Sequence, residues 1–429
     1  MNDNQENSSS TSELRRDLTL VDAVGIGLGA IIGAGIFVVT GVAAGVAGPA
    51  FLVGLLLAGV AATCNALSSA ELAAEYPQSG GTYEYGYRLL TPAFGFAAGW
   101  MFLASKLAAG GTVALGFGGY FSRLFPQVPQ RWAAVAAAII LTAANLFGIK
   151  KAGRLNTAVV AVTLLALLYF VAAGIPTFSV DNLVPFAPHG FARIAESAAL
   201  LFFAYTGYAR IATLGEEVSE PRKTIPRAVV ITIVVSVLLY SAVALVAVGN
   251  VGAGALAETN SPLQRAAEGF AWPNVPLVVG VGATTAMLGV LLSQIVGISR
   301  MMFAMARRGD LPKVLEHTSE RYSVPDAGIL LSGLVIVLLS IFGTLEWVLS
   351  AAAFTILLYY LIANIAALKL KPEKKIYPRW VAILGAVSCG LLAVSLNFGA
   401  VIAGLILLGT GFLLRWLLGK LGTVERPGG

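Results

Sequence analysis

The amino-acid sequence predicts an all-α integral membrane protein with about twelve transmembrane helices. Of its 429 residues, 57% are hydrophobic and only 12% are charged, whereas a typical soluble chain carries about 25% charged residues. The apolar residues form runs of about 20 residues, which is the length of a membrane-spanning helix. Such runs are too long for the strands of a membrane barrel and lack their alternation, so a helical bundle is expected.

The predicted spans follow one another with short connections and no soluble domain between them. They lie at residues 22–46, 49–74, 94–121, 132–148, 155–176, 192–216, 227–249, 275–304, 326–343, 347–369, 378–394 and 398–417. Tyr83 and Tyr85 follow the second span, and their position favours a short helix at the membrane surface. Both cysteines, Cys64 and Cys389, fall in spans without ligand spacing, so they are expected to be small buried side chains.

Lysine and arginine residues are unevenly distributed between the two sides of the predicted bundle. With the amino terminus placed inside, 22 of the 28 lie in inner loops and tails, and four lie in outer loops. This asymmetry predicts cytoplasmic termini in a cell (inner) membrane. The formal charge of +6 thus reflects topology and anionic lipids, and nucleic acid is not an expected partner. We expect polar tails at 1–14 and 421–429 around a membrane domain at 15–420.

Two predicted spans contain sequences that are poor continuous helices. The first has five glycines between Gly25 and Gly35, and each costs about 1 kcal/mol relative to alanine in a helix interior. The sixth carries Thr206 and Gly207 in its middle. Breaks at these two points lie five spans apart, so the second runs in the opposite direction. This spacing predicts inverted repeats at about 22–176 and 192–369, followed by two extra spans at about 378–417.

Broken helices in a bilayer expose backbone groups that need partners. Free amides at the amino end of a half-helix attract an anion, and free carbonyls at the other break attract a cation or ammonium group. Together these two sites describe an amino acid zwitterion at the membrane midplane. An alternative is that the glycines serve only close helix packing.

Several motifs now give the chain a recognisable pattern. They are Ile31-Ile-Gly33-Ala-Gly35-Ile-Phe37, Glu71-Leu-Ala-Ala-Glu75-Tyr-Pro77-Gln-Ser-Gly80-Gly81-Thr-Tyr83, Asn145-Leu-Phe-Gly148-Ile-Lys150, Phe202-Phe-Ala-Tyr-Thr-Gly207, Glu220-Pro221-Arg-Lys223-Thr-Ile-Pro226 and Ala306-Arg-Arg-Gly309-Asp-Leu-Pro312. With these motifs in this order, the chain resembles the amino acid–polyamine–organocation superfamily over roughly residues 15–420. The resemblance implies the leucine-transporter fold and amino acid transport without covalent chemistry, so an enzyme is not expected.

The resemblance also implies a substrate site made mainly of backbone groups. The substrate carboxylate is expected at the amides around Gly33, Ala34 and Gly35, and its amino group at carbonyls of Phe203, Ala204 and Thr206. Side chains that line the pocket are expected to include Tyr205, Tyr208 and span residues near Lys106.

Charged residues inside spans are rare and are candidates for coupling or gating. Lys106 lies near the middle of the third span, and Arg210 follows the second break; for both, a structural role remains an alternative. The superfamily often has a lysine where this chain has Thr163, and we hypothesise that Lys106 supplies that charge. Glu196 near the outer start of the sixth span is another protonatable candidate. Ion pairs at the inner ends of spans, rather than a proton relay, are expected to involve Glu71, Glu75, Glu216 and Glu217.

These observations predict a secondary transporter of amino acids that works by alternating access. Neutral substrates are favoured because neither intramembrane charge is negative. A sodium site is not expected, because Ala286-Met-Leu-Gly-Val290 lacks hydroxyls, so coupling is expected by proton symport or by exchange. No cofactor and no metal site are expected, and the oligomeric state is left open. The alternatives are an exchanger or uniporter of polyamines or other organic amines, and a membrane amino-acid sensor that does not transport.

Overall fold

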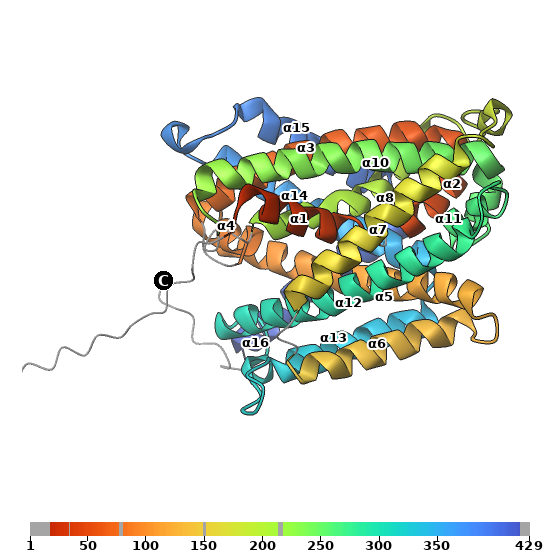
Figure 1. Ribbon diagram of the computed structural model, residues 1–429. Helices are drawn as coiled ribbons and strands as arrows, with labels where there is room; N and C mark the ends of the chain where they lie inside the picture. Colours follow the sequence, from red (N-terminus) through yellow and green to blue (C-terminus); the bar gives the residue numbers. More distant parts are fainter. Residues whose placement is uncertain (1–17, 34, 77–79, 149–151, 213–217, 421–429) are drawn as a thin grey trace, which may run out of the picture.

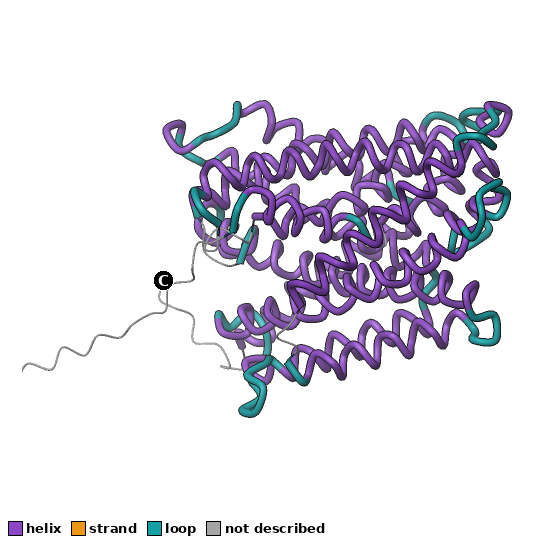
Figure 2. The backbone as a smooth tube through the Cα atoms, in the orientation of Figure 1, coloured by secondary structure: helices purple, strands orange, loops and turns teal. Residues whose placement is uncertain are grey.

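The computed structural model describes residues 18–33, 35–76, 80–148, 152–212 and 218–420. Within these ranges the chain is almost entirely helical and has no strands, apart from one isolated bridge between Leu18 and Val218. Figure 2 shows this as a bundle of nearly parallel rods joined by short loops. The prediction of an all-α membrane protein is confirmed.

The first half of the described chain contains the helices of the first predicted repeat. They are α1 (Leu20–Ile31), the π-helical turn η1 (Gly35–Val39), α2 (Thr40–Ala47), the 3₁₀ turn η2 (Gly48–Ala50), α3 (Phe51–Glu75), α4 (Thr82–Leu89), α5 (Pro92–Leu124), α6 (Gln130–Leu146) and α7 (Ala152–Gly174). The short helix α4 contains Tyr83 and Tyr85, as expected from their position after the second span.

The second half continues with a corresponding series of helices. They are η3 (Val180–Leu183), α8 (Ala192–Tyr205), η4 (Thr206–Tyr208), α9 (Ala209–Ala212), α10 (Pro221–Ala257), α11 (Pro262–Ala267), α12 (Val275–Arg307), η5 (Lys313–Glu316), α13 (Asp326–Phe342), α14 (Leu345–Leu368), η6 (Pro372–Lys374), α15 (Arg379–Ser395) and α16 (Phe398–Lys420). The long helix α10 is interrupted near its end at Gly252, whose φ of 75° is outside the helical region.

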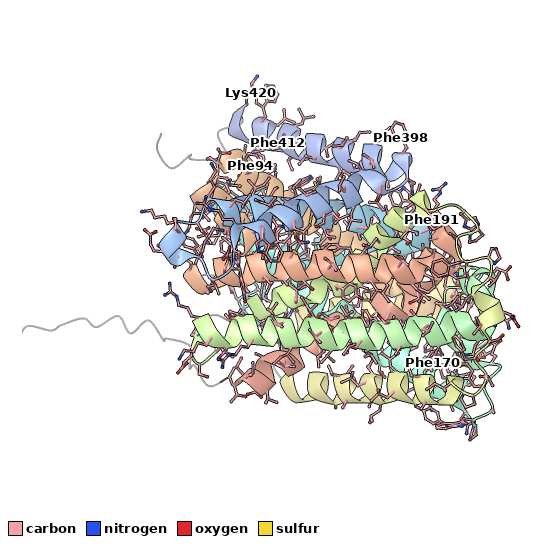
Figure 3. The ribbon with its side chains drawn as sticks, turned by 90° about the horizontal axis from the view of Figure 1, so that it is seen from above. Phe94, Phe170, Phe191, Phe398, Phe412 and Lys420 are labelled. Atoms are coloured by element: carbon pink, nitrogen blue, oxygen red, sulfur yellow. The ribbon has the colours of Figure 1, made fainter. Side chains whose placement is uncertain are left out.

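Length and apolarity identify six helical stretches in the described ranges that are able to cross a membrane. The first of them, Leu20–Glu75, covers two predicted spans, and three further apolar helices are shorter. The expected number of about twelve spans stays a prediction. Apolar side chains such as Phe398 and Trp416 point outward from the bundle, as expected for a surface that faces lipid. In Figure 3, α16 lies at the rim, with Phe398 and Lys420 near its two ends.

Both predicted breaks are present. The first predicted span is divided into α1 and η1–α2, and the sixth is divided into α8 and η4–α9. The two interrupted helices lie in the interior of the bundle, between the long helices α3, α10, α5 and α12 (Figure 1). Their position surrounds each break with protein rather than lipid, which is the condition for irregular backbone at membrane depth.

The packing of the helices reveals the inverted repeat that no residue-level similarity showed. Contacts between helices of the first five spans recur between the corresponding helices of the second five, in which α10 corresponds to α3, α12 to α5, α13 to α6 and α14 to α7. Thus α3 packs on α8 as α10 packs on α1, α5 packs on α6 as α12 packs on α13, and α5 packs on α14 as α12 packs on α7. This pattern is the one expected of the leucine-transporter fold.

We call the end of the bundle that carries Leu20 and Lys420 the terminal end, and the opposite end the distal end. The terminal end is at the left of Figure 1 and also carries α4, while α11 and the junction of α2 with α3 lie at the distal end.

Candidate functional site

The first break follows a well-defined helix start. Thr19 and Asp22 form a capping box at the amino end of α1, which satisfies amides that a helix leaves free. The helix ends at Ile31, and Ile32 has an extended ψ of 90°. Chain geometry becomes helical again only at Gly35, as a π-helical turn. Ala34, one of the predicted substrate contacts, lies outside the described residues.

The second break is a tightening of the helix rather than a gap. At Tyr205 the α-helical geometry gives way to the 3₁₀ turn η4, and α9 follows. The hydroxyl of Thr206 donates to the carbonyl oxygen of Phe203 at 2.9 Å. The backbone amide of Thr206 donates to the same oxygen, so this carbonyl accepts two hydrogen bonds at the helix end.

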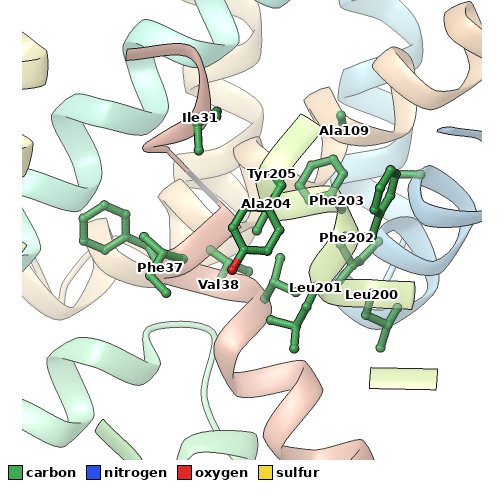
Figure 4. Close-up of a cluster of buried hydrophobic side chains, with 14 of the residues drawn as sticks. Ile31, Phe37, Val38, Ala109, Leu200, Leu201, Phe202, Phe203, Ala204 and Tyr205 are labelled. Atoms are coloured by element: carbon green, nitrogen blue, oxygen red, sulfur yellow. The ribbon is translucent and has the colours of Figure 1, made fainter. Parts of the chain in front are cut away.

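The two breaks pack directly on each other. A Cβ added to Gly35 would lie 2.6 Å from the Cα of Ala204, and one added to Gly207 would lie even closer to the carbonyl of Ala30. Only glycine fits at both positions, so each break presents a glycine to the residue just before the other break. Figure 4 shows Ile31 and Phe37 on either side of the first break, next to Phe203 and Ala204 of α8.

Tyrosine side chains from the surrounding helices complete the hydrogen bonding of both breaks. Tyr240 of α10 donates to the carbonyl of Ile31 at 2.7 Å, and Tyr120 of α5 donates to that of Phe37 at 2.7 Å. Tyr360 of α14 donates to the carbonyl of Thr206 at 3.4 Å. The sequence analysis missed all three, because a tyrosine within a span carries no local signal of which backbone group it reaches.

A small cavity of about 50 Å³ lies where the breaks meet. Its lining includes Gly33 and Gly35 from the first break and Phe203, Ala204 and Thr206 from α8 and η4. The structure thus brings together the described residues of the predicted backbone site. The rest of the lining comes from Ala30, Ile31, Lys106, Val113, Gly207, Val290 and Gln294.

Lys106 and Gln294 are the polar side chains that line this cavity from the two central helices. The Nζ atom of Lys106 lies 5.7 Å from the ring centroid of Phe102, one turn earlier on α5. The Oε1 atom of Gln294 on α12 is buried without a hydrogen-bond partner. Sequence reasoning missed Gln294; a lone amide in an apolar span is the signal that was available.

The predicted aromatic lining is placed differently. The hydroxyl of Tyr205 reaches the carbonyl of Leu55 on α3 at 3.4 Å, and the ring of Tyr208 packs on Tyr360 with centroids 5.3 Å apart. Neither tyrosine lines the cavity. Their role in substrate recognition stays a prediction.

The other coupling candidates are spread along the bundle. Thr163 is buried in α7 and donates to the carbonyl of Val159 at 2.7 Å. Glu196 pairs with Arg193 near the distal end of α8. Arg210 is exposed on α9 beyond the second break. Glu216 and Glu217 lie outside the described residues.

A larger cavity of about 480 Å³ lies at the distal end. It is bordered by Gly41 and Val42 of α2, by Asn260 before α11 and by Thr344 and Glu346 at the start of α14. The terminal end is tied by ion pairs instead: Glu75 at the end of α3 contacts both Arg222 and Lys374.

The short helix α4 is bound to this terminal end by charges as well. Its Glu84 pairs with Arg88 and Arg308. Burial raises the pKa of the Glu84 carboxyl, but hydrogen bonds from the two guanidinium groups outweigh it, and the pKa lies below its usual value. Asp310, from the Arg-Arg-Gly-Asp motif, accepts hydrogen bonds from Tyr83 and Tyr87.

Comparison with known proteins agrees with this geometry. The amino acid permease family model matches residues 22–417. An uncharacterized transporter of Mycobacterium tuberculosis is 41% identical over 93% of this chain and 90% of its own length. The branched-chain amino acid permease of Bacillus subtilis is 29% identical over 87% and 84%. Cationic amino acid transporter 4 of Mus musculus is 31% identical over 86% of this chain and 62% of its own length. The chain therefore belongs to the amino acid permease family and is a membrane transporter, not an enzyme.

Proposed function

We propose that this permease is a secondary transporter of neutral amino acids whose substrate binds between the two helix breaks. The observation that carries the proposal is the cavity at which Gly33 and Gly35 of one break face Phe203, Ala204 and Thr206 of the other. Backbone ends of opposite polarity meet there, inside protein and away from lipid.

The backbone groups suit the two charges of an amino acid. The amino end of η1–α2 carries a partial positive charge, which favours the substrate carboxylate near Gly33, Ala34 and Gly35. The carboxyl end of α8 carries a partial negative charge, which favours the ammonium group near the carbonyls of Phe203, Ala204 and Thr206. The intervening side chains then contact the substrate's own side chain.

Lys106 supports a neutral rather than a cationic substrate. A second positive charge in this cavity would be repelled by its ammonium group in a low-dielectric interior. The names of the relatives point in two directions, towards branched-chain and towards cationic amino acids. We therefore base the preference on Lys106, which lines the cavity of this chain.

Transport requires the breaks to separate. A cavity of about 50 Å³ has room for a few water molecules but not for an amino acid. The cavity at the distal end borders α2, whereas the helices at the terminal end are joined by the ion pairs of Glu75 with Arg222 and Lys374. We infer that α1–α2 and α8–α9 move against the other helices to expose the site alternately. The positive-inside rule places the terminal end, with both termini, in the cytoplasm of the cell membrane.

For coupling we infer proton symport or exchange without sodium. Thr163 stands where the superfamily often has a lysine, and Lys106 supplies a positive charge from the neighbouring helix α5. Loss or gain of a proton on this ammonium changes the charge of the cavity, so it links substrate binding to pH.

Uptake of labelled amino acids into proteoliposomes tests this function. The vesicles are preloaded with the same or another amino acid, or given an inward proton gradient, and protein-free vesicles serve as the control. We expect saturable uptake of neutral amino acids with little competition by arginine. Uptake of polyamines alone would contradict the proposal, and binding without uptake by correctly inserted protein would show a sensor instead.

A further inference from the structure

A second group of buried polar residues lies away from the substrate cavity, in the seam between α3, α14 and α15. Asn65, Ser68 and Glu71 are spaced three residues apart, so they follow one face of α3. At one end of this stripe, Asn65 contacts Asn364 of α14 and Cys389 of α15. At the other end, Glu71 Oε2 accepts from the backbone amides of residues 376 and 377, just before α15. Ser68 therefore faces the same seam.

Two oxygen atoms in this seam have no partner among the described residues. The Oγ atom of Ser68 is buried without a hydrogen bond. The amide of Asn364 donates to Asn65 and to the carbonyl of Tyr360, and its Oδ1 is left without a partner. A group of this kind destabilises the fold if it stays dry. Buried polar groups of this kind are normally satisfied by internal water.

The polar seam ends at the second break on one side. The carbonyl of Tyr360 accepts from Asn364 at 2.8 Å, and its hydroxyl donates to the carbonyl of Thr206 at 3.4 Å. The ring of Tyr360 packs on that of Tyr208, and both hydroxyl groups are buried. A water file in the seam would thus reach the hydrogen bonds of η4.

The other end of the seam is a buried ion pair. Glu71 is only 2% exposed, and its Oε1 lies 3.5 Å from Nζ of Lys375. This Nζ has no hydrogen-bond partner, so it is able to bind a water. A carboxylate that is buried, protonatable and close to the terminal surface is a suitable end for a proton path.

We propose that the seam of α3, α14 and α15 binds a file of water molecules and carries protons between Tyr208 and the Glu71–Lys375 pair. The inference rests on the proposed function and deepens it, by giving the coupled proton a path to the terminal end that is separate from the substrate path. A proton that reaches Glu71 neutralises the carboxylate and releases Lys375; when the proton leaves, the pair forms again. Only O–H bonds form and break.

Other titratable groups surround this path from the helices that pack on α3. The nearest beyond Lys375 is Glu75, one turn later, with its partners Arg222 of α10 and Lys374 of η6. The remaining groups are Cys64 on α3, Tyr205 on α8, Arg210 on α9, Tyr359 and Tyr360 on α14, Tyr85 on α4, Tyr377 just before α15 and Cys389 within α15. Glu373 of η6 offers a matched control, because it is an exposed carboxylate two residues before Lys375.

Hydroxyl-radical footprinting by X-ray radiolysis tests for the water directly, because bound water labels side chains that bulk solvent does not reach. The experiment uses the full-length protein in nanodiscs. We expect oxidation of Cys389, which is fully buried, and no oxidation of the equally buried Met101. The substitution Ser68→Val, which fills the seam with methyl groups, is expected to remove the Cys389 label. Absence of the label in the unmodified protein would overturn the proposal.

Uptake by Glu71→Gln tests the proton path. Glutamine keeps an acceptor for the amides of residues 376 and 377 but does not take up a proton at neutral pH. We expect loss of the stimulation of uptake by an inward proton gradient, while exchange with preloaded amino acid continues. Glu373→Gln is expected to keep the stimulation. The Ser68→Val variant repeats the test without changing any charge.

The outcomes separate this inference from the proposed function. Stimulation that survives in both Glu71→Gln and Ser68→Val would disprove the path. Saturable uptake that never responds to the proton gradient, even in the unmodified protein, would also disprove it while leaving amino acid transport intact. Failure of all uptake would instead contradict the proposed function, and with it the proton path that rests on transport.

Discussion

The glycines of this chain differ in what surrounds them, and the sequence alone does not show which of them lie in close contacts. Gly25 on α1 has open space where a side chain would stand. Gly35 and Gly207 have none, because each meets the backbone of the opposite break. An interior glycine of the first kind costs helix stability, whereas one of the second kind allows two backbones to touch.

We expect Gly207→Ala to abolish uptake and to lower the free energy of unfolding by about 1–3 kcal/mol, the usual effect of overpacking. The added methyl group has no space beside the carbonyl of Ala30. Gly25→Ala is the matched control and is expected to keep uptake and to raise stability slightly, because alanine is the better helix former. Thermal unfolding in detergent and uptake in proteoliposomes measure the two effects. Equal behaviour of the two variants would show that the breaks do not need their close contact.

Lys106 offers a second test at the scale of one side chain. Replacing it by methionine keeps the length of the side chain and removes the charge that lines the cavity. We expect Lys106→Met to flatten the dependence of uptake on pH and to increase competition by arginine relative to leucine. Lys369→Met, just past the end of α14, is the control. An unchanged pH profile in Lys106→Met would assign this lysine a packing role.

Each interrupted helix depends on its neighbours as an element. The carbonyls that a continuous helix would satisfy are bonded by Tyr240, Tyr120 and Tyr360, one from each of α10, α5 and α14. These helices therefore fix the ends of the breaks, and none of the three hydroxyl-bearing residues lines the cavity between them. Such an arrangement allows irregular backbone without the penalty of unpaired groups.

Removal of one of these hydroxyls has a measurable effect. We expect Tyr240→Phe to destabilise the protein by about 0.5–1.5 kcal/mol, the net value of one hydrogen bond, and to reduce uptake because the carbonyl of Ile31 loses its partner. Tyr169→Phe removes a hydroxyl that bonds an exposed loop carbonyl, and it is expected to change neither property. Thermal unfolding compares the two.

The loop between α12 and α13 contains a pair that responds to pH. The Nδ1 atom of His317 lies 2.7 Å from a carboxylate oxygen of Asp326, and the hydrogen bond that the ring donates to this carboxylate raises the pKa of the imidazole above 6.5. The protonated His317 therefore stabilises the folded protein fully at pH values below the pKa of histidine in the unfolded chain. This stabilisation is lost as the pH rises through the pKa that His317 has in the folded protein. We expect the histidine titration seen by NMR to move to lower pH in Asp326→Asn. An unshifted titration would show that the pair does not form.

At the scale of the whole molecule, the orientation follows from the positive-inside rule. The terminal end carries most of the basic residues, and we expect both ends of the chain to be cytoplasmic. Tags at the amino and carboxyl ends are therefore expected to resist protease added to intact cells and to be cleaved once the membrane is opened. A tag inserted in the distal loop near Asn260 is the control, since it is expected to be cleaved in intact cells.

Much of the architecture follows from the sequence because it depends on local composition. Apolar runs predicted the helices, and the glycines around Gly33 together with Thr206 and Gly207 predicted the breaks. The roles of Gln294 and Tyr240 did not follow, because a single polar residue in a span gives no sign of its partner on a distant helix. The inverted repeat is visible in the contacts between helices, and these contacts do not require similar residues at corresponding positions.

The contact between the two breaks has a consequence for how the sequence is able to change. Gly35 requires a small neighbour at Ala204, and Gly207 requires close approach at Ala30. Both contacts involve backbone atoms of the opposite break, so no change of side chain in one half of the chain makes room for a larger residue in the other. Gly35→Ala would therefore not be rescued by Ala204→Gly, because the Cα atom of residue 204 would still lie 2.6 Å from the added Cβ.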